Sequence, residues 1–171
     1  MIAYAVLVLA TGAERIVELV LSKRHAAVAF ARGGVEYGRG HFPWLVALHT
    51  GLLVACLAEV FLGDRPFLPY LGWPMFALVL ASQALRYWCV ATLGQQWNTR
   101  VIVVPGAGAV RRGPYRWMHH PNYLAVVVEG IALPLVYTAW ITAVVFTVLN
   151  AVLLLRIRIP TEDRALAMLE R

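Results

Sequence analysis

The chain is poor in charged residues and in cysteine, and both shortages narrow the class of protein to which it can belong. Charged residues make up 14% of its 171 positions and hydrophobic residues 61%, a balance far outside the average for soluble globular domains. The two cysteines, Cys56 and Cys89, lie alone within apolar stretches, so they indicate neither a disulfide framework nor a metal site. The metal-binding motifs HExxH and paired CxxC are also missing, so we expect no bound metal, and no nucleophile elbow is present.

Long apolar runs predict an all-α integral membrane protein. A stretch of about 20 apolar residues spans a bilayer as a helix. The sequence has four such stretches, and the last is too long for one helix and is interrupted at Pro134, so we divide it in two. A broken or tilted hairpin in this last region is the alternative. The five expected spans are 2–21, 42–63, 68–93, 122–136 and 139–159.

The first span is expected to be a retained helix instead of a signal peptide. It has no basic segment ahead of it, and its apolar run continues into Glu14, Arg15 and Glu18 where a cleavage site would be needed. Arginine strongly outnumbers lysine, which hints at a GC-rich bacterial genome. We therefore expect the protein in a bacterial cytoplasmic membrane.

Basic residues gather on one side of the predicted spans. The net charge is +6, and twelve of the fifteen basic residues fall in the connections on that side. The positive-inside rule makes this side cytoplasmic, with the N-terminus outside and the C-terminus inside. The excess charge is therefore a topology signal, and no nucleic-acid partner is expected. The twelve are Lys23, Arg24, Arg32, Arg39, Arg100, Arg111, Arg112, Arg116, Arg156, Arg158, Arg164 and Arg171.

A polar, basic and aromatic segment interrupts the apolar pattern between the third and fourth predicted spans. Residues 113–123 read Gly-Pro-Tyr-Arg-Trp-Met-His-His-Pro-Asn-Tyr and open directly onto the next apolar run. A loop that only connects two helices needs no such set. Arg158 and the acidic pair Glu162 and Asp163 follow the last apolar run. Together the two groups predict one active site at the membrane face.

Ionisable side chains inside the predicted spans form a second set of candidates. Such groups are costly in a bilayer and usually face the bundle interior or a cavity. They lie at the same depth as the polar segment, which predicts a substrate-binding cavity open to the cytosol or the inner leaflet. Ion pairs and a histidine that serve only helix packing are the alternative. The residues are Glu14, Glu18, His49, Gln83, Arg86 and Glu129.

The connection 94–121 is expected to contain a short strand. Thr99–Val104 has the composition of an extended segment, and Pro105 and Gly106 end it. The Gly106-Ala-Gly108 sequence that follows lacks the βαβ unit of a dinucleotide-binding fold, so we discount it as a nucleotide motif. The segment 22–41 is expected to begin as an interfacial helix and to break at Gly33.

Three motifs resemble the isoprenylcysteine carboxyl methyltransferase family of integral-membrane enzymes. They are Gly113-Pro-Tyr115, His119-His120-Pro121-Asn122-Tyr123, and Arg158 followed by Glu162 and Asp163. The resemblance covers residues 70–165, the expected cofactor-binding core of a single domain (residues 1–171) whose N-terminal helices occupy 1–65. It implies a helical membrane bundle that uses S-adenosylmethionine, releases S-adenosylhomocysteine and holds this cofactor at its cytoplasmic side with the C-terminal half.

The resemblance also implies roles for individual residues. Gly113, Tyr115, His120, Pro121 and Tyr123 would belong to the cofactor site. Glu162 would lie where cofactor and methyl acceptor meet, as would Arg158.

Some positions are more similar to a bacterial branch of the family. His119 stands where eukaryotic members have arginine, and Ala125 where they have glycine. With the segment 97–100 and Glu129, these departures resemble enzymes that methylate long-chain polyketides such as alkylpyrones or alkylresorcinols. The expected acceptor is therefore a lipophilic small molecule from the inner leaflet, either a polyketide or phenolic lipid or a prenyl-type carboxylate.

Methyl transfer from a sulfonium to oxygen needs alignment, exclusion of water and management of one proton. Aromatic faces suit the sulfonium cation, and the backbone around Val104 can hold an adenine edge. Arg158 and Arg100 are the candidates to stabilise an oxyanion, and Glu129 and His120 are the candidate bases. Asn98 completes the expected substrate-binding set.

Two other functions stay open at the level of the sequence. A phospholipid N-methyltransferase shares a helical membrane design and a terminal acidic pair, although an amine acceptor would favour carboxylates over Arg100 and Arg158. A small transporter or membrane scaffold is the non-enzymatic alternative, but transporters commonly show internal repeats and none is visible here. The sequence carries no signal of oligomeric state.

Overall fold

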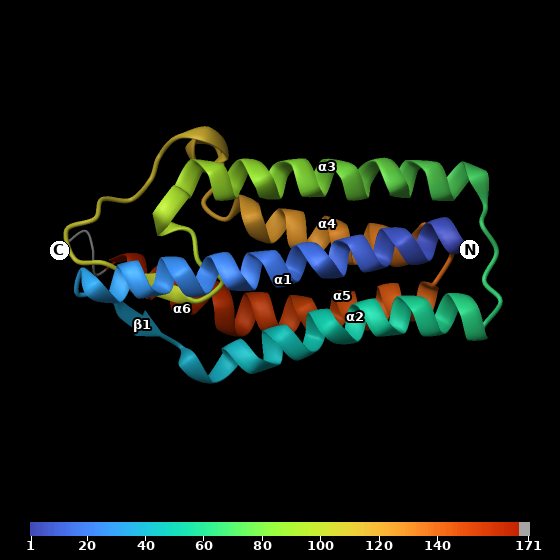
Figure 1. Cartoon of the computed structure of the whole chain (residues 1–171), viewed down its shortest axis with the longest axis horizontal. Coiled ribbons are helices and arrows are strands. Elements are labelled where there is room, and N and C mark those ends of the chain that lie inside the picture. The colour runs from blue at the N-terminus through green and yellow to red at the C-terminus, as the bar shows by residue number, and fades with distance from the viewer. Residues whose placement is uncertain (168–171) are drawn as a thin grey trace.

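The computed structural model describes residues 1–167, and most of them are helical. Five long helices lie side by side along the long axis of the molecule (Figure 1). They are α1 (Ile2–Ala31), α2 (Phe42–Leu62), α3 (Pro69–Leu93), α4 (Pro121–Leu135) and α5 (Trp140–Leu153). The shorter elements are β1 (Val35–Tyr37), η1 (Arg39–His41), η2 (Gly94–Gln96), β2 (Val101–Val103), η3 (Gly113–Arg116), the π-helical turn η4 (Leu154–Arg158) and α6 (Ile159–Ala167).

Three helical segments within the described residues are long and apolar enough to cross a membrane. They are Arg39–Leu62, Pro69–Gln96 and Trp140–Ala167. The fourth predicted span, α4, is apolar but has only 15 residues, and α1 is long but carries Glu14, Arg15 and Glu18. The structure therefore agrees with a mostly helical membrane protein, whereas the count of five spans stays a prediction.

Two helices extend well beyond the predicted spans. The first was expected to end near residue 21, but α1 continues without a break to Ala31, just before the predicted break at Gly33. The last runs from Trp140 to Ala167, because the π-helical turn η4 joins α5 to α6 without a loop. The expected interruption at Pro134 is confirmed, since α4 ends one residue later.

The helix α4 lies at the centre of the bundle. Nine of its fifteen residues are buried, and it packs against both α3 and α5. At Gly130 a Cβ atom would lie 2.0 Å from Cε1 of Phe146 on α5, so these two helices approach more closely than any other residue would allow. Tyr4 of α1 donates a hydrogen bond to the Leu133 carbonyl at 3.1 Å and attaches α1 to the same core.

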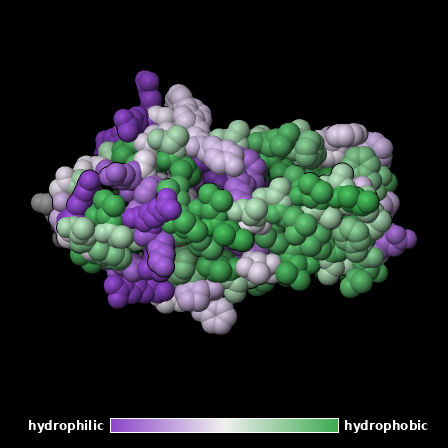
Figure 2. All heavy atoms as spheres, in the orientation of Figure 1, coloured by the Kyte–Doolittle hydropathy of each residue, from purple (hydrophilic) through white to green (hydrophobic). Residues whose placement is uncertain are grey.

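Hydrophilic residues gather at the end of the bundle that holds β1 and α6 (Figure 2). This end contains the two-stranded sheet, in which β1 pairs antiparallel with β2 and Val35 lies opposite Val103. The strand expected within Thr99–Val104 is thus confirmed as β2, but no sequence pattern predicted its partner β1. The polar end agrees with the uneven charge of the connections, while the orientation in a membrane stays a prediction.

Candidate active site

A cavity of about 840 Å³ lies at the polar end of the bundle. Its walls come from the end of α1, the segment from η2 through β2, the connection that includes η3, the start of α4, and the η4–α6 helix. The predicted site residues that line it are Asn98, Arg100, Val104, Tyr115, His120, Tyr123, Arg158 and Glu162. The polar segment and the acidic pair, which are far apart in the sequence, therefore meet at one cavity.

One wall of the cavity is a cluster of hydrogen-bonding side chains from α4 and α6. Tyr123 donates its phenolic hydrogen to Oε2 of Glu162. His120 lies stacked on Tyr123, with ring centroids 5.3 Å apart, and its Nε2 is 3.0 Å from Oδ1 of Asp163. The other ring nitrogen of His120, Nδ1, lies 3.7 Å from Oε2 of Glu162, too far for a good hydrogen bond.

The acidic pair controls the charge of His120. The neighbouring Glu162 carboxylate, followed by that of Asp163, raises the pKa of His120 above its ordinary value, against the opposing effect of burial. Near neutral pH this histidine is therefore more readily protonated than a free imidazole. Burial also raises the pKa of Tyr115, so that phenol stays neutral.

Arg158 lies in the same wall and is almost completely buried, with 5% of its surface exposed. Its Nη2 donates to the Thr99 carbonyl at 3.0 Å, and its Nη1 lies 3.1 Å from Nε2 of His41. The guanidinium carbon is 5.9 Å from the centroid of the Tyr123 ring. Arg158 is the last residue of the π-helical turn η4, and such turns often occur at functional sites.

The loop that carries Asn98 and Arg100 is held in place by α1. Ser22 donates to Oδ1 of Asn98 at 2.7 Å, and the Asn98 amide donates to the Ser22 carbonyl at 3.1 Å. The backbone N–H of Arg100 donates to the same Asn98 oxygen at 2.9 Å. Because these bonds occupy the Asn98 side chain, it shapes the loop that carries Arg100 and β2.

Several buried polar atoms of the lining residues have no hydrogen-bond partner within the described part of the chain. They are Nδ1 of His120, Oδ1 of Asn122 and Nε of Arg158. Buried polar groups in proteins are normally paired, and an unpaired group often marks a ligand site or bound water. A polar ligand in the cavity would give each of these atoms a partner.

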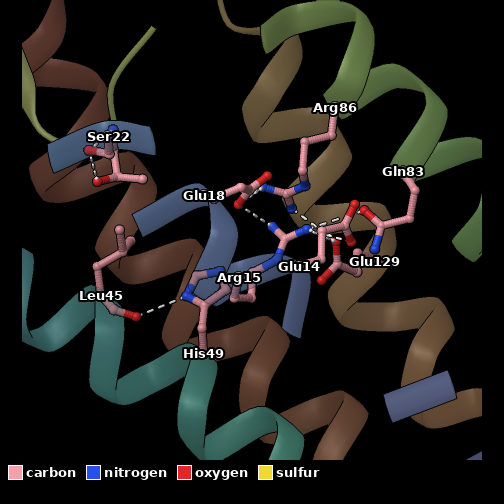
Figure 3. Close-up of polar contacts among 10 residues, drawn as sticks. Glu14, Arg15, Glu18, Ser22, Leu45, His49, Gln83, Arg86 and Glu129 are labelled. Carbon is pink, nitrogen blue, oxygen red and sulfur yellow. Dashed lines mark hydrogen bonds and ion pairs between the residues drawn. The ribbon is translucent and has the colours of Figure 1, made fainter. Parts of the chain in front are cut away.

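The polar and ionisable residues of the predicted spans, apart from His49, form a separate charge cluster (Figure 3). None of its members lines the cavity. Arg15 lies 2.9 Å from Glu18, and Arg86 lies 2.9 Å from Glu129 and 3.7 Å from Glu18. The Arg86 and Glu129 side chains are only 5% and 4% exposed. The charge cluster consists of Glu14, Arg15, Glu18, Gln83, Arg86 and Glu129.

The remaining predicted site residues also lie outside the cavity lining. His49 donates through Nδ1 to the Leu45 carbonyl at 2.9 Å, one turn back in α2 (Figure 3). Gly113 begins η3 and packs against Thr92 of α3. Pro121 is buried at the first position of α4, where it fixes the start of that helix beside His120.

Sequence reasoning missed three residues that shape the cavity wall: Ser22, His41 and Thr99. Each acts on a predicted residue through a contact between segments far apart in the chain. Ser22 and Thr99 gave no individual signal. His41 had a weak one, because it directly precedes an apolar run as His120 does.

Comparison with known proteins assigns the chain to a family. The family profile of isoprenylcysteine carboxyl methyltransferases (ICMT) matches residues 75–168, and the chain belongs to this family. It is 38% identical over 154 residues to the uncharacterized protein YpbQ of Bacillus subtilis (strain 168), with 90% of each chain covered. It is 26% identical over 158 residues to an uncharacterized protein of Haemophilus influenzae (strain ATCC 51907 / DSM 11121 / KW20 / Rd), covering 91% of this chain and 90% of that one. No solved structure matches the chain.

The family identifies a methyltransferase, and the apolar helices fit an enzyme of the membrane. The matched region contains α4, α6 and most of the cavity wall, but it excludes α1, β1 and α2. Ser22 and His41 therefore come from the part of the chain that the family profile does not cover.

Proposed function

We propose that this protein is an S-adenosylmethionine-dependent O-methyltransferase that acts on a lipophilic acceptor from the inner leaflet. The observation that carries the proposal is the meeting of His120, Tyr123, Arg158 and Glu162 around one cavity at the polar end of an apolar bundle. These residues come from two sequence motifs that resemble those of the family to which the chain belongs, and their convergence around one cavity supports the proposal.

The residues present fit this cofactor. The unpaired Asn122 oxygen and His120 nitrogen supply an acceptor and a donor for its polar groups. Glu162 is suited to ribose hydroxyls, and the faces of Tyr115 and Tyr123 are suited to a sulfonium. When bound, S-adenosylmethionine supplies an electrophilic methyl group.

Arg158 is the candidate catalytic residue for the acceptor. A buried guanidinium stabilises an acceptor oxygen that is, or becomes, negatively charged, and the low-dielectric surroundings strengthen this effect. Of the two candidate bases, His120 lines the cavity, whereas Glu129 is paired with Arg86 in the charge cluster. The carboxylates beside His120 favour its protonated form, which cannot take up a proton, so we assign His120 to the cofactor and a structural role to Glu129.

An apolar groove offers a place for a long alkyl chain. It lies between α2 and α5, has a volume of about 610 Å³, and extends along the helix from Ile141 to Ile157. At 1.5 Å per residue this is about 24 Å, longer than the roughly 15 Å depth of one hydrocarbon leaflet. Ile157 directly precedes Arg158, so a lipid in the groove would have its polar end beside the cavity.

A methyl-transfer assay tests the proposal. Detergent-purified protein is incubated with labelled S-adenosylmethionine and one of three acceptors: a long-chain alkylresorcinol, a prenylcysteine, or phosphatidylethanolamine. Label on either oxygen acceptor supports the proposal. Label confined to phosphatidylethanolamine would replace it with the N-methyltransferase alternative. Arg158→Lys, which replaces a planar fork by a point charge, is expected to lose transfer while it still binds S-adenosylhomocysteine.

A further inference from the structure

The imidazole of His41 holds Arg158 from a part of the chain outside the family match. His41 ends η1, directly before α2, and is 8% exposed. Its Nε2 lies 3.1 Å from Nη1 of Arg158. A guanidinium has only donors, so Nε2 must accept this hydrogen bond and the ring must be neutral, with its proton on Nδ1.

The second terminal nitrogen of Arg158 is held as well. Nη2 donates to the Thr99 carbonyl at 3.0 Å, while the buried Nε has no partner within residues 1–167. With both ends of its fork fixed, the guanidinium cannot turn without breaking one of these bonds. These bonds use two of the five N–H donors of Arg158, so Nε and the second hydrogen of each terminal nitrogen are left for a ligand.

The loop before α2 is shaped around the His41 ring. Gly38 has a φ of +66°, a conformation that side chains with a Cβ rarely adopt. A Cβ at this position would lie 2.3 Å from Cε1 of His41 and 2.7 Å from its Nδ1. A glycine at position 38 therefore leaves room for the imidazole. This local fit around the ring indicates that the position of His41 is a built feature of the loop.

The His41–Arg158 pair lies between residues that line the apolar groove and residues that line the cavity. Arg158 lines the cavity and its neighbour Ile157 lines the groove. On the other side, Trp44, about one helical turn after His41, also lines the groove. The pair thus stands between the expected place of the alkyl chain and the expected place of methyl transfer.

We propose that His41 is a positioning residue, which in its neutral form aims Arg158 at the acceptor oxygen. This inference rests on the proposed function, because that function gives Arg158 its role. The acceptor is then a lipid whose oxygen reaches one of the remaining N–H donors of Arg158 from the groove. His41 itself touches neither acceptor nor cofactor and acts through the guanidinium.

The charge of His41 controls this contact. The charged groups that act on it are Arg158 on η4 and Glu36 on β1, and Glu36 is itself paired with Arg39 at 3.1 Å and Arg100 at 3.6 Å. A protonated imidazole cannot accept a hydrogen bond and would place a second cation beside the guanidinium. Lowering the pH therefore releases Arg158, and methyl transfer falls on the acid side.

Two substitutions separate positioning from packing. His41→Phe keeps a ring and removes the acceptor, whereas His41→Gln keeps an acceptor oxygen that cannot be protonated. Methyl transfer to the long-chain alkylresorcinol and to the prenylcysteine is measured from about pH 5 to pH 8, the range in which histidine changes charge. His41→Phe is expected to lower kcat about tenfold or more. His41→Gln is expected to keep most of kcat at neutral pH and to lose the fall on the acid side.

Binding of S-adenosylhomocysteine by each protein identifies the source of any failure. Wild-type protein that does not bind it would overturn the proposed function and this inference with it. Variants that bind normally while His41→Phe keeps wild-type kcat at every pH would overturn the role of His41 alone. If His41→Phe fails to fold, the test depends on His41→Gln. A fall in its kcat on the acid side, like that of the wild type, would overturn the role of His41.

A spectroscopic measurement does not depend on the acceptor. In protein with labelled arginine, nitrogen NMR resonances of the Arg158 side chain, assigned with Arg158→Lys, are expected to move in His41→Phe and to move on acidification of the wild type. Resonances that stay unchanged in both cases would show that His41 does not hold the guanidinium.

Discussion

Tyr123, in the first turn of α4, donates its phenolic hydrogen to the carboxylate of Glu162 on α6. The two residues are 39 positions apart, and both lie within the part of the chain that the methyltransferase family profile matches. Their bond closes one wall of the cavity, and it exists because the α4–α5 hairpin returns the chain to the polar end. The proposed cofactor site depends on this return.

Removing the charge of Glu162 is expected to weaken cofactor binding. A hydrogen bond to a charged group contributes about 1.5–3 kcal/mol, so Glu162→Gln should lower the affinity for S-adenosylhomocysteine about tenfold or more. Isothermal titration calorimetry measures this change. Asp163→Asn, at a side chain that is 57% exposed, is the matched control and should have a smaller effect. Equal affinities for wild type and Glu162→Gln would remove Glu162 from the cofactor site.

The protein without cofactor should lose the stabilising effect of His120 as the pH rises. Glu162, and then Asp163, raise the pKa of His120 in the folded state above its ordinary value of 6.5. Such a group stabilises the fold fully below its unfolded-state pKa, and this contribution disappears as the pH rises through the folded-state pKa. His120→Gln should therefore lower the thermal unfolding midpoint more at about pH 6 than at about pH 9.

Thermal unfolding midpoints of His119→Gln over the same pH range control for the loss of an imidazole next to the first turn of α4. If the difference in thermal unfolding midpoint between wild type and His120→Gln stays constant or grows as the pH rises, the assigned ion pairs are contradicted.

The charge cluster is expected to hold α1, α3 and α4 together. Arg86→Leu leaves Glu129 and Glu18 without this cation, and breaking a buried pair costs about 3–5 kcal/mol. Arg65→Leu is the control, because Arg65 also lies 2.9 Å from a carboxylate, that of Glu59, but is 31% exposed and its loss should cost less. Thermal unfolding in detergent compares the two, and a milder effect at Arg86 would argue against a structural role.

A larger side chain in the apolar groove should weaken the binding of acceptors that have a long alkyl chain. A Cβ at Gly51, which lines the groove, meets nothing within 4 Å, so Gly51→Leu can be accommodated and its side chain can occupy the groove. We expect a KM for a long-chain alkylresorcinol raised about tenfold, with unchanged binding of S-adenosylhomocysteine. Val54→Leu, an exposed position on α2 outside the groove lining, is the control. An unchanged KM would place the alkyl chain elsewhere.

The sequence predicted the helices well where apolar composition and proline decide the structure. The apolar runs predicted α2 and α3, and Pro134 predicted the end of α4. The π-helical turn that carries Arg158 could not be predicted, because it differs from an α-helix only in its hydrogen bonding. The partner of β2 was missed for a related reason, since β1 has three residues and no sequence pattern of its own.

The site was predicted in part. Motif residues such as His120 and Glu162 line the cavity. Glu18 was placed in the substrate cavity from its expected depth in the membrane alone, and it does not line the cavity. Glu18 belongs to the charge cluster, while Ser22, one helical turn further along α1, contacts the cavity loop. The contact between His41 and Arg158, 117 positions apart, follows from packing of the chain and leaves no local pattern.

The most direct test of the methyltransferase account is a calorimetric titration of the detergent-purified protein with S-adenosylhomocysteine, beside the same titration of His120→Ala. The account predicts saturable binding by the wild type, at about micromolar affinity, and its loss or strong weakening in the variant. A folded wild-type protein that does not bind S-adenosylhomocysteine would contradict the cofactor site, and equal binding by both proteins would contradict the place assigned to it.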